Sequence, residues 1–187
     1  MENWSYSIRF QRHNRDLNIQ GDKINLRIAE LKDTEAIFEW ENDVSHWFVS
    51  DTIAPYTFEE IQYFLVNTND IFNSGQTRLI IENSDNVAVG CVDLFDFNPK
   101  NKRLGLGILI DENHRGMGYG KEAIKLSSDF AFVSLDVQTI YAEVPESNKG
   151  SQRIFMSCGF QLSGVKKDWL WDGESFQNQL FYQKLRG

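Results

Sequence analysis

The chain has 187 residues, of which 41 % are hydrophobic and 25 % are charged, so it can form one domain with a substantial core. Its 27 acidic residues outnumber 19 Lys and Arg, which argues against general nucleic-acid binding and mildly favours a cationic partner. There is no apolar run long enough to cross a membrane, no secretory signal and no metal-ligand spacing, and there are only two cysteines, so we expect a cytoplasmic protein without a metal.

The beginning of the chain predicts an extension followed by a strand. Residues 1–22 are polar and show no period, and we expect them to precede a single domain formed by residues 23–187. Residues 24–31, INLRIAEL, place apolar side chains at alternate positions, as in a half-buried strand.

Two helices are predicted next. Asp33 is a candidate N-cap for a helix that carries Trp40 on its apolar face. Thr57 and Glu60 have the spacing of a capping box, which predicts the start of the second helix. Acidic residues lie around and between these helices and form either a solvated face or one wall of a cationic site: Glu39, Glu41, Asp43 and Asp51.

The centre of the chain is rich in strands. Residues 77–83, 87–97 and 103–110 are apolar or alternating runs, and polar turns separate them. A helix with an apolar stripe opens at Gly118, and residues 139–144 predict a further strand.

The C-terminal part predicts a short helix and a hairpin. The helix runs from about residue 148 to 158 and stops at Gly159, because glycine suits the left-handed conformation that ends a helix. Residues 164–171 and 175–185 flank an Asp172-Gly173 turn signal. No repeat or linker divides the chain, so we predict one α+β domain.

Residues 113–121, NHRGMGYGK, form the most informative segment. Gly116, Gly118 and Gly120 are spaced G-x-G-x-G, which fits neither the dinucleotide fingerprint nor the nucleoside-triphosphate loop. Glycines at the start of a helix expose successive N–H groups where the helix dipole is positive, and such a nest binds a pyrophosphate. Arg115 can add a charge-assisted contact. The alternative is that the glycines only turn a strand into a helix.

The segment 115–120 resembles the R/Q-x-x-G-x-G/A loop of the GNAT superfamily of N-acetyltransferases. Residues 26–43 are similar to the first strand and helix of its ribosomal-protein alanine acetyltransferase and spermidine acetyltransferase branch, and residues 89–97 are similar to its third strand. Asn148 and Ser151 match its N-x-x-S segment. In order and spacing, the resemblance covers residues 24–185.

This resemblance implies a central, strongly twisted mixed sheet of about seven strands flanked by about four helices. The fourth and fifth strands separate, and acetyl-coenzyme A (acetyl-CoA) lies between them. The residues that the resemblance assigns to the cofactor are Ile108, Leu109, Ile110, Arg115, Gly116, Met117, Gly118, Tyr119, Gly120, Lys121, Asn148 and Ser151.

Acetyl transfer to an amine needs a neutral amine, a polarised carbonyl and a stabilised thiolate. Many relatives use a tyrosine as the acid for the thiolate, but this chain has Phe155 there, and Gly105 replaces a glutamate of the spermidine acetyltransferases. The remaining candidates for the chemistry are Asp93, Glu143 and Ser151. The candidates for the acceptor site are Trp40, Asp93, Trp169 and Trp171, with core or dimer contacts as their alternative.

We therefore predict an acetyl-CoA-dependent N-acetyltransferase that acts on a primary amine. The acceptor is a small polyamine-like or amino-sugar amine, or a protein N-terminus, and the acidic helix region favours the small cation. The alternatives are a CoA-binding domain that has lost catalysis and an interaction module whose loop binds nothing. We expect no nucleic-acid or membrane partner, and a homo-oligomer is possible.

Overall fold

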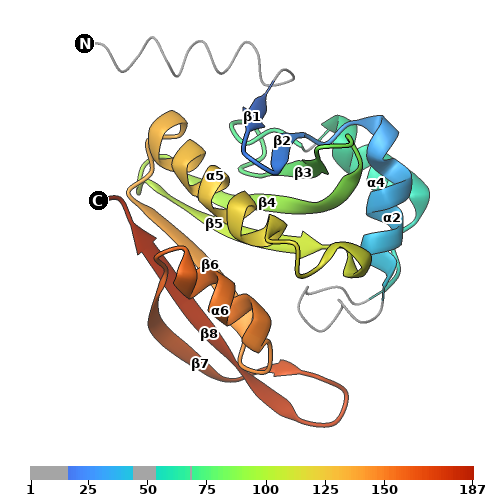
Figure 1. The fold of residues 1–187 in the computed structure, drawn as a ribbon. Coiled ribbons are helices and arrows are strands. Elements are labelled where there is room, and N and C mark those ends of the chain that lie inside the picture. The colour runs from blue at the N-terminus through green and yellow to red at the C-terminus, as the bar shows by residue number, and fades with distance from the viewer. Residues whose placement is uncertain (1–16, 44–53, 68) are drawn as a thin grey trace.

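The computed structural model describes residues 17–43, 54–67 and 69–187 of the chain. These residues form an eight-stranded sheet in the order β1-β2-β3-β4-β5-β6-β8-β7, with helices on both faces (Figure 1). The strands are β1 (Asn18–Gln20), β2 (Ile24–Ile28), β3 (Thr77–Asn83), β4 (Ala88–Asn98), β5 (Arg103–Ile110), β6 (Thr139–Pro145), β7 (Gln161–Trp171) and β8 (Phe176–Leu185). The helices are α2 (Thr34–Asn42), α4 (Phe58–Asn67), α5 (Tyr119–Ser134) and α6 (Lys149–Ser157), and η2 (Leu31–Asp33) and η3 (Glu112–His114) are short 3-10 turns.

The α+β prediction is confirmed, with one strand more than expected. The additional strand is β1, which pairs antiparallel with β2 through Asn18↔Arg27, Ile19↔Leu26 and Gln20↔Asn25. The sheet therefore begins before the predicted domain boundary at residue 23. Residues 1–16 of the predicted extension, and Asp51 of the acidic group, lie outside the described residues.

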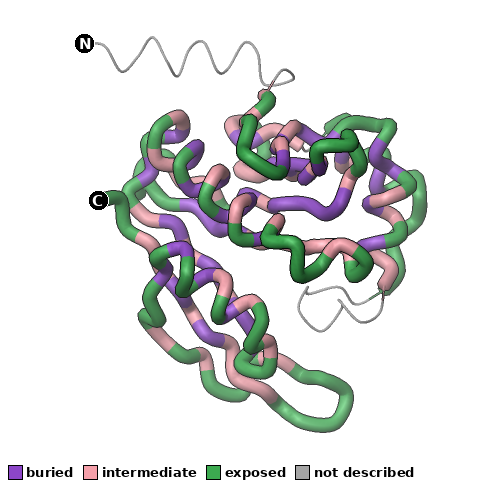
Figure 2. Tube along the Cα trace, viewed as in Figure 1, coloured by how far each residue is buried: buried purple, intermediate pink, exposed green. Residues whose placement is uncertain are grey.

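Two cores lie on opposite faces of the sheet. Helices α5 and α6 cover one face, where Ala123, Ile124 and Phe155 belong to the larger core. Helices α2 and α4 cover the other face of β2, β3 and β4, and Ile37 and Ile61 lie in that second core. Figure 2 shows buried residues along the central strands, whereas the far end of the β7–β8 hairpin is exposed. Among the described residues, none of the helices has the length and apolar character needed to span a bilayer.

The predicted caps had different outcomes. The capping box at Thr57 is confirmed, because the Glu60 N–H donates to Thr57 Oγ1 at 3.2 Å and the Thr57 N–H donates to Glu60 Oε2 at 2.7 Å. Asp33 occupies the predicted N-cap position of α2, but its carboxylate makes no cap bond to that helix. It instead accepts two hydrogen bonds from Arg27, each of 2.7 Å. The attraction of a half-buried guanidinium outweighs a single helix cap.

Candidate active site

The central feature of the site is a gap within the sheet. Strands β5 and β6 are the parallel pair, and they are paired at only three positions, ending with Gly105↔Tyr141. Beyond this point the two strands diverge, as Figure 1 shows between the yellow-green and orange parts of the chain. A cavity of about 810 Å³ lies beside the end of β5, between the N-terminal ends of α5 and α6. Of the predicted cofactor residues it is lined by Ile108, Leu109, Ile110, Arg115, Gly116, Gly118, Tyr119, Gly120, Lys121, Asn148 and Ser151.

Two glycines give the predicted phosphate loop its shape. Gly116 has φ of 81° and Gly118 has φ of 88°, so both lie in the left-handed region that side chains rarely adopt. A Cβ at Gly116 would meet nothing within 4 Å, which leaves the loop backbone open to a ligand. Gly118 is also the N-cap of the sixteen-residue helix α5. The loop thus presents bare backbone at the positive end of a long helix, as an anion cradle requires.

Asp111 anchors the turn η3 that leads into this loop. Its carboxylate accepts hydrogen bonds from the Asn113 N–H at 2.9 Å and from the Trp40 indole Nε1 at 3.2 Å. Burial opposes ionisation of Asp111, but the hydrogen bonds from Asn113, Trp40 and His114 outweigh it and lower its pKa. Trp40 is only 6 % exposed and lies in the second core. These contacts give Trp40 a supporting role for η3, and its predicted place in the wall of the acceptor site stays a prediction.

The remaining cofactor candidates have structural contacts as well as cavity positions. Arg115 Nε donates to the Ile110 carbonyl at 3.1 Å, which ties the loop to the end of β5. Asn148 caps α6, because its Oδ1 accepts a hydrogen bond from the Ser151 N–H at 3.0 Å. Met117 does not line the cavity, and its side chain is 49 % exposed.

Phe155 is part of the core and not of the reaction centre. Its side chain is 3 % exposed and makes an edge-to-face contact with Phe160, with ring centroids 5.0 Å apart. A phenyl ring carries no proton to donate, so the tyrosine acid of relatives has no counterpart at this position. Cys158 is also buried, and its Sγ lies 3.5 Å from the Lys121 carbonyl oxygen.

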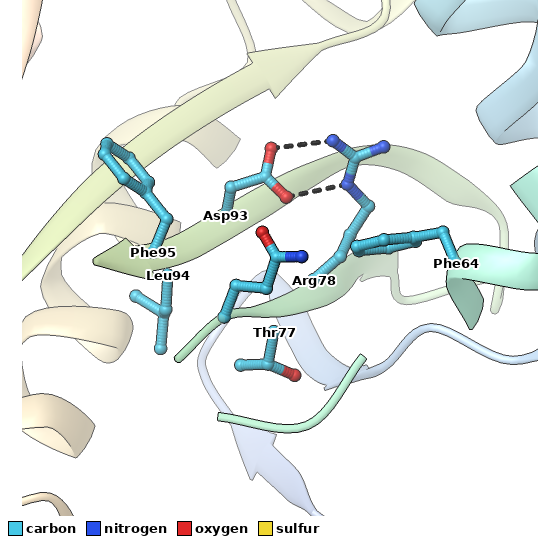
Figure 3. A pocket seen from close by; sticks show the side chains of 7 residues that line it. Phe64, Thr77, Arg78, Asp93, Leu94 and Phe95 are labelled. Atoms are coloured by element: carbon cyan, nitrogen blue, oxygen red, sulfur yellow. Dashed lines mark hydrogen bonds and ion pairs between the residues drawn. The ribbon is translucent and has the colours of Figure 1, made fainter. Parts of the chain in front are cut away.

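Asp93 lies on the face of the sheet opposite α5, paired with a largely buried arginine. Arg78 Nε donates to Asp93 Oδ1 at 2.7 Å and Arg78 Nη2 donates to Oδ2 at 2.9 Å (Figure 3). Glu41 of the predicted acidic group binds the same guanidinium, with its Oε1 2.5 Å from Arg78 Nη1. Burial opposes the charge on Arg78, but the two carboxylates outweigh it and keep its pKa well above the usual value. A cavity of about 230 Å³ adjoins Asp93, Phe64 and Phe95.

The other predicted catalytic and acceptor residues of this part of the sheet lie on β6 and β7. Glu143 Oε1 accepts a hydrogen bond from Lys166 Nζ at 2.5 Å, and this ammonium lies 4.9 Å from the centre of the Trp169 ring. Trp169 is 59 % and Trp171 57 % exposed, both on β7. The ring of Trp171 lies against Phe176 across the hairpin, with centroids 5.0 Å apart.

Comparison with known proteins connects this arrangement to a family. Residues 23–161 match the acetyltransferase (GNAT) domain. The chain belongs to the GNAT family. The spermidine N(1)-acetyltransferase of Vibrio cholerae is 27 % identical to this GNAT chain over 146 residues, covering 76 % of the chain and 81 % of that protein. The uncharacterized N-acetyltransferase p20 of Bacillus licheniformis is 27 % identical over 154 residues, covering 79 % of the chain and 84 % of that protein.

A solved structure shows the same fold. The crystal structure of spermidine N-acetyltransferase from Vibrio cholerae in complex with CoA and spermine matches this GNAT chain with a TM-score of 0.75 at 23 % identity. The match covers 87 % of this chain and 95 % of that one. The predicted fold and the predicted N-acetyltransferase activity are thereby confirmed.

Sequence reasoning missed several residues of this GNAT site. Arg78 is the most important, and its signal was a charged residue directly before the apolar residues 79–81 of β3. Arg153 and Ile154 line the cavity from α6, one turn beyond Gly150, and helical spacing would have found them. Tyr141 was also missed, and its hydroxyl donates to Asp96 at 2.9 Å.

Proposed function

We propose that this GNAT enzyme transfers the acetyl group of acetyl-CoA to a primary amine of a small cationic molecule such as a polyamine. The observation that carries this proposal is the cavity beside the gap between β5 and β6, which has a glycine-lined anion cradle at one end. A cradle for phosphates and an opening through the sheet suit a cosubstrate that is anionic at one end and reactive at the other.

The residues around the cavity fit acetyl-CoA. The N–H groups of residues 116–120 would hold the pyrophosphate, and residues 108–110 would face the pantetheine arm. Asn148 and Ser151 line the same cavity from the start of α6. The cosubstrate supplies an activated acetyl thioester, and the chain's own residues bind and orient it and keep water away.

Two carboxylates are candidates to attract the amine and receive its proton. Both oxygens of Asp93 accept hydrogen bonds from Arg78, so both are already engaged as acceptors. Glu143 accepts a hydrogen bond from Lys166 through Oε1, and it lies on β6 beside the gap. We therefore favour Glu143 as the carboxylate that draws the amine, with Asp93 holding Arg78 in place. Ser151 is the candidate proton donor to the thiolate.

The cationic nature of the acceptor is supported by two observations. Arg78 is paired with both Glu41 and Asp93, so this cluster of three side chains carries a formal excess of one negative charge. Curated relatives include spermidine N(1)-acetyltransferases, whose named acceptor is a polycation. An opposite charge near the acceptor site raises the local concentration of a cationic substrate.

The alternative function is a domain that binds CoA without turnover. It is supported by the absence of a tyrosine at position 155 and of a carboxylate at position 105, where a Cβ would strike the Phe95 ring. A thiolate is a tolerable leaving group, so the loss of one acid need not abolish transfer.

The test combines binding with turnover. Thermal melts across an acetyl-CoA series should show an unfolding midpoint that rises with the logarithm of the concentration above Kd, with about 2.7 kcal/mol of added stability at a hundredfold excess over Kd. Release of free thiol should then follow with spermidine, spermine, an aminoglycoside or an N-terminal peptide as acceptor. Binding of acetyl-CoA without release of free thiol in the presence of any of these amines would support the alternative, a CoA-binding domain without turnover. An unfolding midpoint that does not rise up to millimolar acetyl-CoA would contradict both functions.

A further inference from the structure

The turn between β1 and β2 contacts the phosphate loop from behind. Lys23 Nζ donates a hydrogen bond to the Met117 carbonyl at 3.2 Å, although the two residues are 94 positions apart. Glu122, in the first turn of α5, accepts hydrogen bonds from the backbone N–H groups of Asp22 and Lys23. The contact is close, because a Cβ at Gly21 would collide with the Glu122 carboxylate.

The Lys23 contact fixes the direction of a loop N–H group. The described residues contain no cis peptide bond, so the carbonyl of Met117 and the N–H of Gly118 point in opposite directions within their shared peptide plane. A donor that holds the Met117 carbonyl on the β1–β2 side therefore directs the Gly118 N–H away from that side. Gly118 is the N-cap of α5 and lines the cavity, so this N–H belongs to the cradle.

Lys23 also brings a positive charge to the loop. Its Nζ lies 3.3 Å from the position that a Cβ of Gly118 would occupy, so glycine at 118 leaves room for the ammonium. Lys23 does not line the cavity itself. Its charge adds to the positive end of α5, and a charge near a bound anion strengthens the attraction.

Glu122 completes this arrangement from the helix. A carboxylate in the first turn is favourable for the helix dipole, but it would repel a neighbouring phosphate. Here two backbone N–H groups of the β1–β2 turn bind it, which directs its charge toward the turn. The same two hydrogen bonds hold Lys23 against the loop.

We propose that Lys23 is a positioning residue for the pyrophosphate of CoA, and that Glu122 and Gly21 hold it in place. Lys23 acts through the Met117–Gly118 peptide and through its charge, from a strand turn that lies outside the loop motif. This inference rests on the proposed function, because it needs a CoA pyrophosphate in the cradle.

The test compares two ligands in the full chain. CoA carries the pyrophosphate, and pantetheine is the same arm without any phosphate. Lys23→Met should weaken CoA roughly tenfold, as expected for the loss of one charge-assisted contact, and should leave pantetheine affinity unchanged. Lys23→Arg should restore most of the CoA affinity, since it keeps the donor and the charge. The dependence of CoA affinity on salt should be weaker in Lys23→Met than in the wild type.

Two further variants separate the specific contact of Lys23 with the loop from general charge effects. Lys32→Met removes the same charge from a side chain that is 60 % exposed and paired with Glu30, so CoA affinity should not change. Glu122→Ala should weaken CoA as Lys23→Met does, because the turn is released from α5.

The outcomes are distinguishable. CoA affinity within twofold of the wild type in Lys23→Met would overturn the inference, and so would equal losses for CoA and pantetheine. If the wild-type chain itself failed to bind CoA, the proposed function would be the part that is wrong.

Discussion

Replacing Arg78 by methionine should destabilise the protein strongly, because it removes the cation that two carboxylates share. The Arg78 side chain is 13 % exposed, and those of Glu41 and Asp93 are 17 % and 35 % exposed. Breaking a buried ion pair from one side costs 3–5 kcal/mol, and the partial exposure of Asp93 favours the lower end, about 3 kcal/mol. For a domain of this length the midpoint of thermal unfolding should then fall by about 6–12 °C.

The assay is thermal unfolding followed by circular dichroism, with urea unfolding to obtain the free energy. The matched control is the triple variant Arg78→Met, Glu41→Gln, Asp93→Asn, which leaves no unpaired charge and should recover more than half of the lost stability. The reasoning is refuted if Arg78→Met melts within about 2 °C of the wild type, because about 3 kcal/mol should shift the midpoint further than that. A triple variant that is no more stable than the single one would also refute it.

Three other predictions concern the loop, a buried thiol and the hairpin. Gly116→Ala should weaken CoA binding and lower the folding stability by roughly 1–2 kcal/mol, because alanine is strained at a φ of 81°. Titration calorimetry with CoA measures the affinity, and an unchanged affinity would argue against the cradle. Burial raises the pKa of Cys91 to about 12, so it should react with a thiol reagent only after unfolding, and fast labelling of Cys91 in the native protein would contradict this. Backbone hydrogen bonds from Ser175 and Glu174 lower the pKa of Asp172 from 3.8 to about 2. Its stabilisation of the hairpin should therefore be present above pH 3.8 and be lost as the pH falls toward 2, and a carboxyl NMR titration centred near 3.8 would contradict this.

Local signals in the sequence were sufficient for most of the elements. The Thr57–Glu60 capping box, the left-handed Gly159 and the turn at Gly173 each depend on residues a few positions apart. The glycine loop was equally local, because a positive φ at Gly116 and Gly118 is a backbone requirement that only glycine meets cheaply.

Contacts between distant segments were not predictable from one sequence. Asp33 was expected to cap a helix, but Arg27 on the neighbouring strand binds its carboxylate. Trp40 was expected in the acceptor site, but Asp111, 71 positions away, accepts its indole N–H. Each side chain had a plausible local role, and a partner that the fold brought near formed the stronger interaction.

The divergence of β5 and β6 also bears on how the protein behaves without its cosubstrate. Past Gly105, none of the described strands pairs with β5 on the β6 side, so this part of β5 lacks a strand partner there, as an edge strand does. Exposed edges can recruit strands of other molecules and lead to aggregation. A ligand lying in the gap would shield this inner edge. We therefore expect CoA in the purification buffer to improve the solution homogeneity of this protein, apart from any gain in thermal stability.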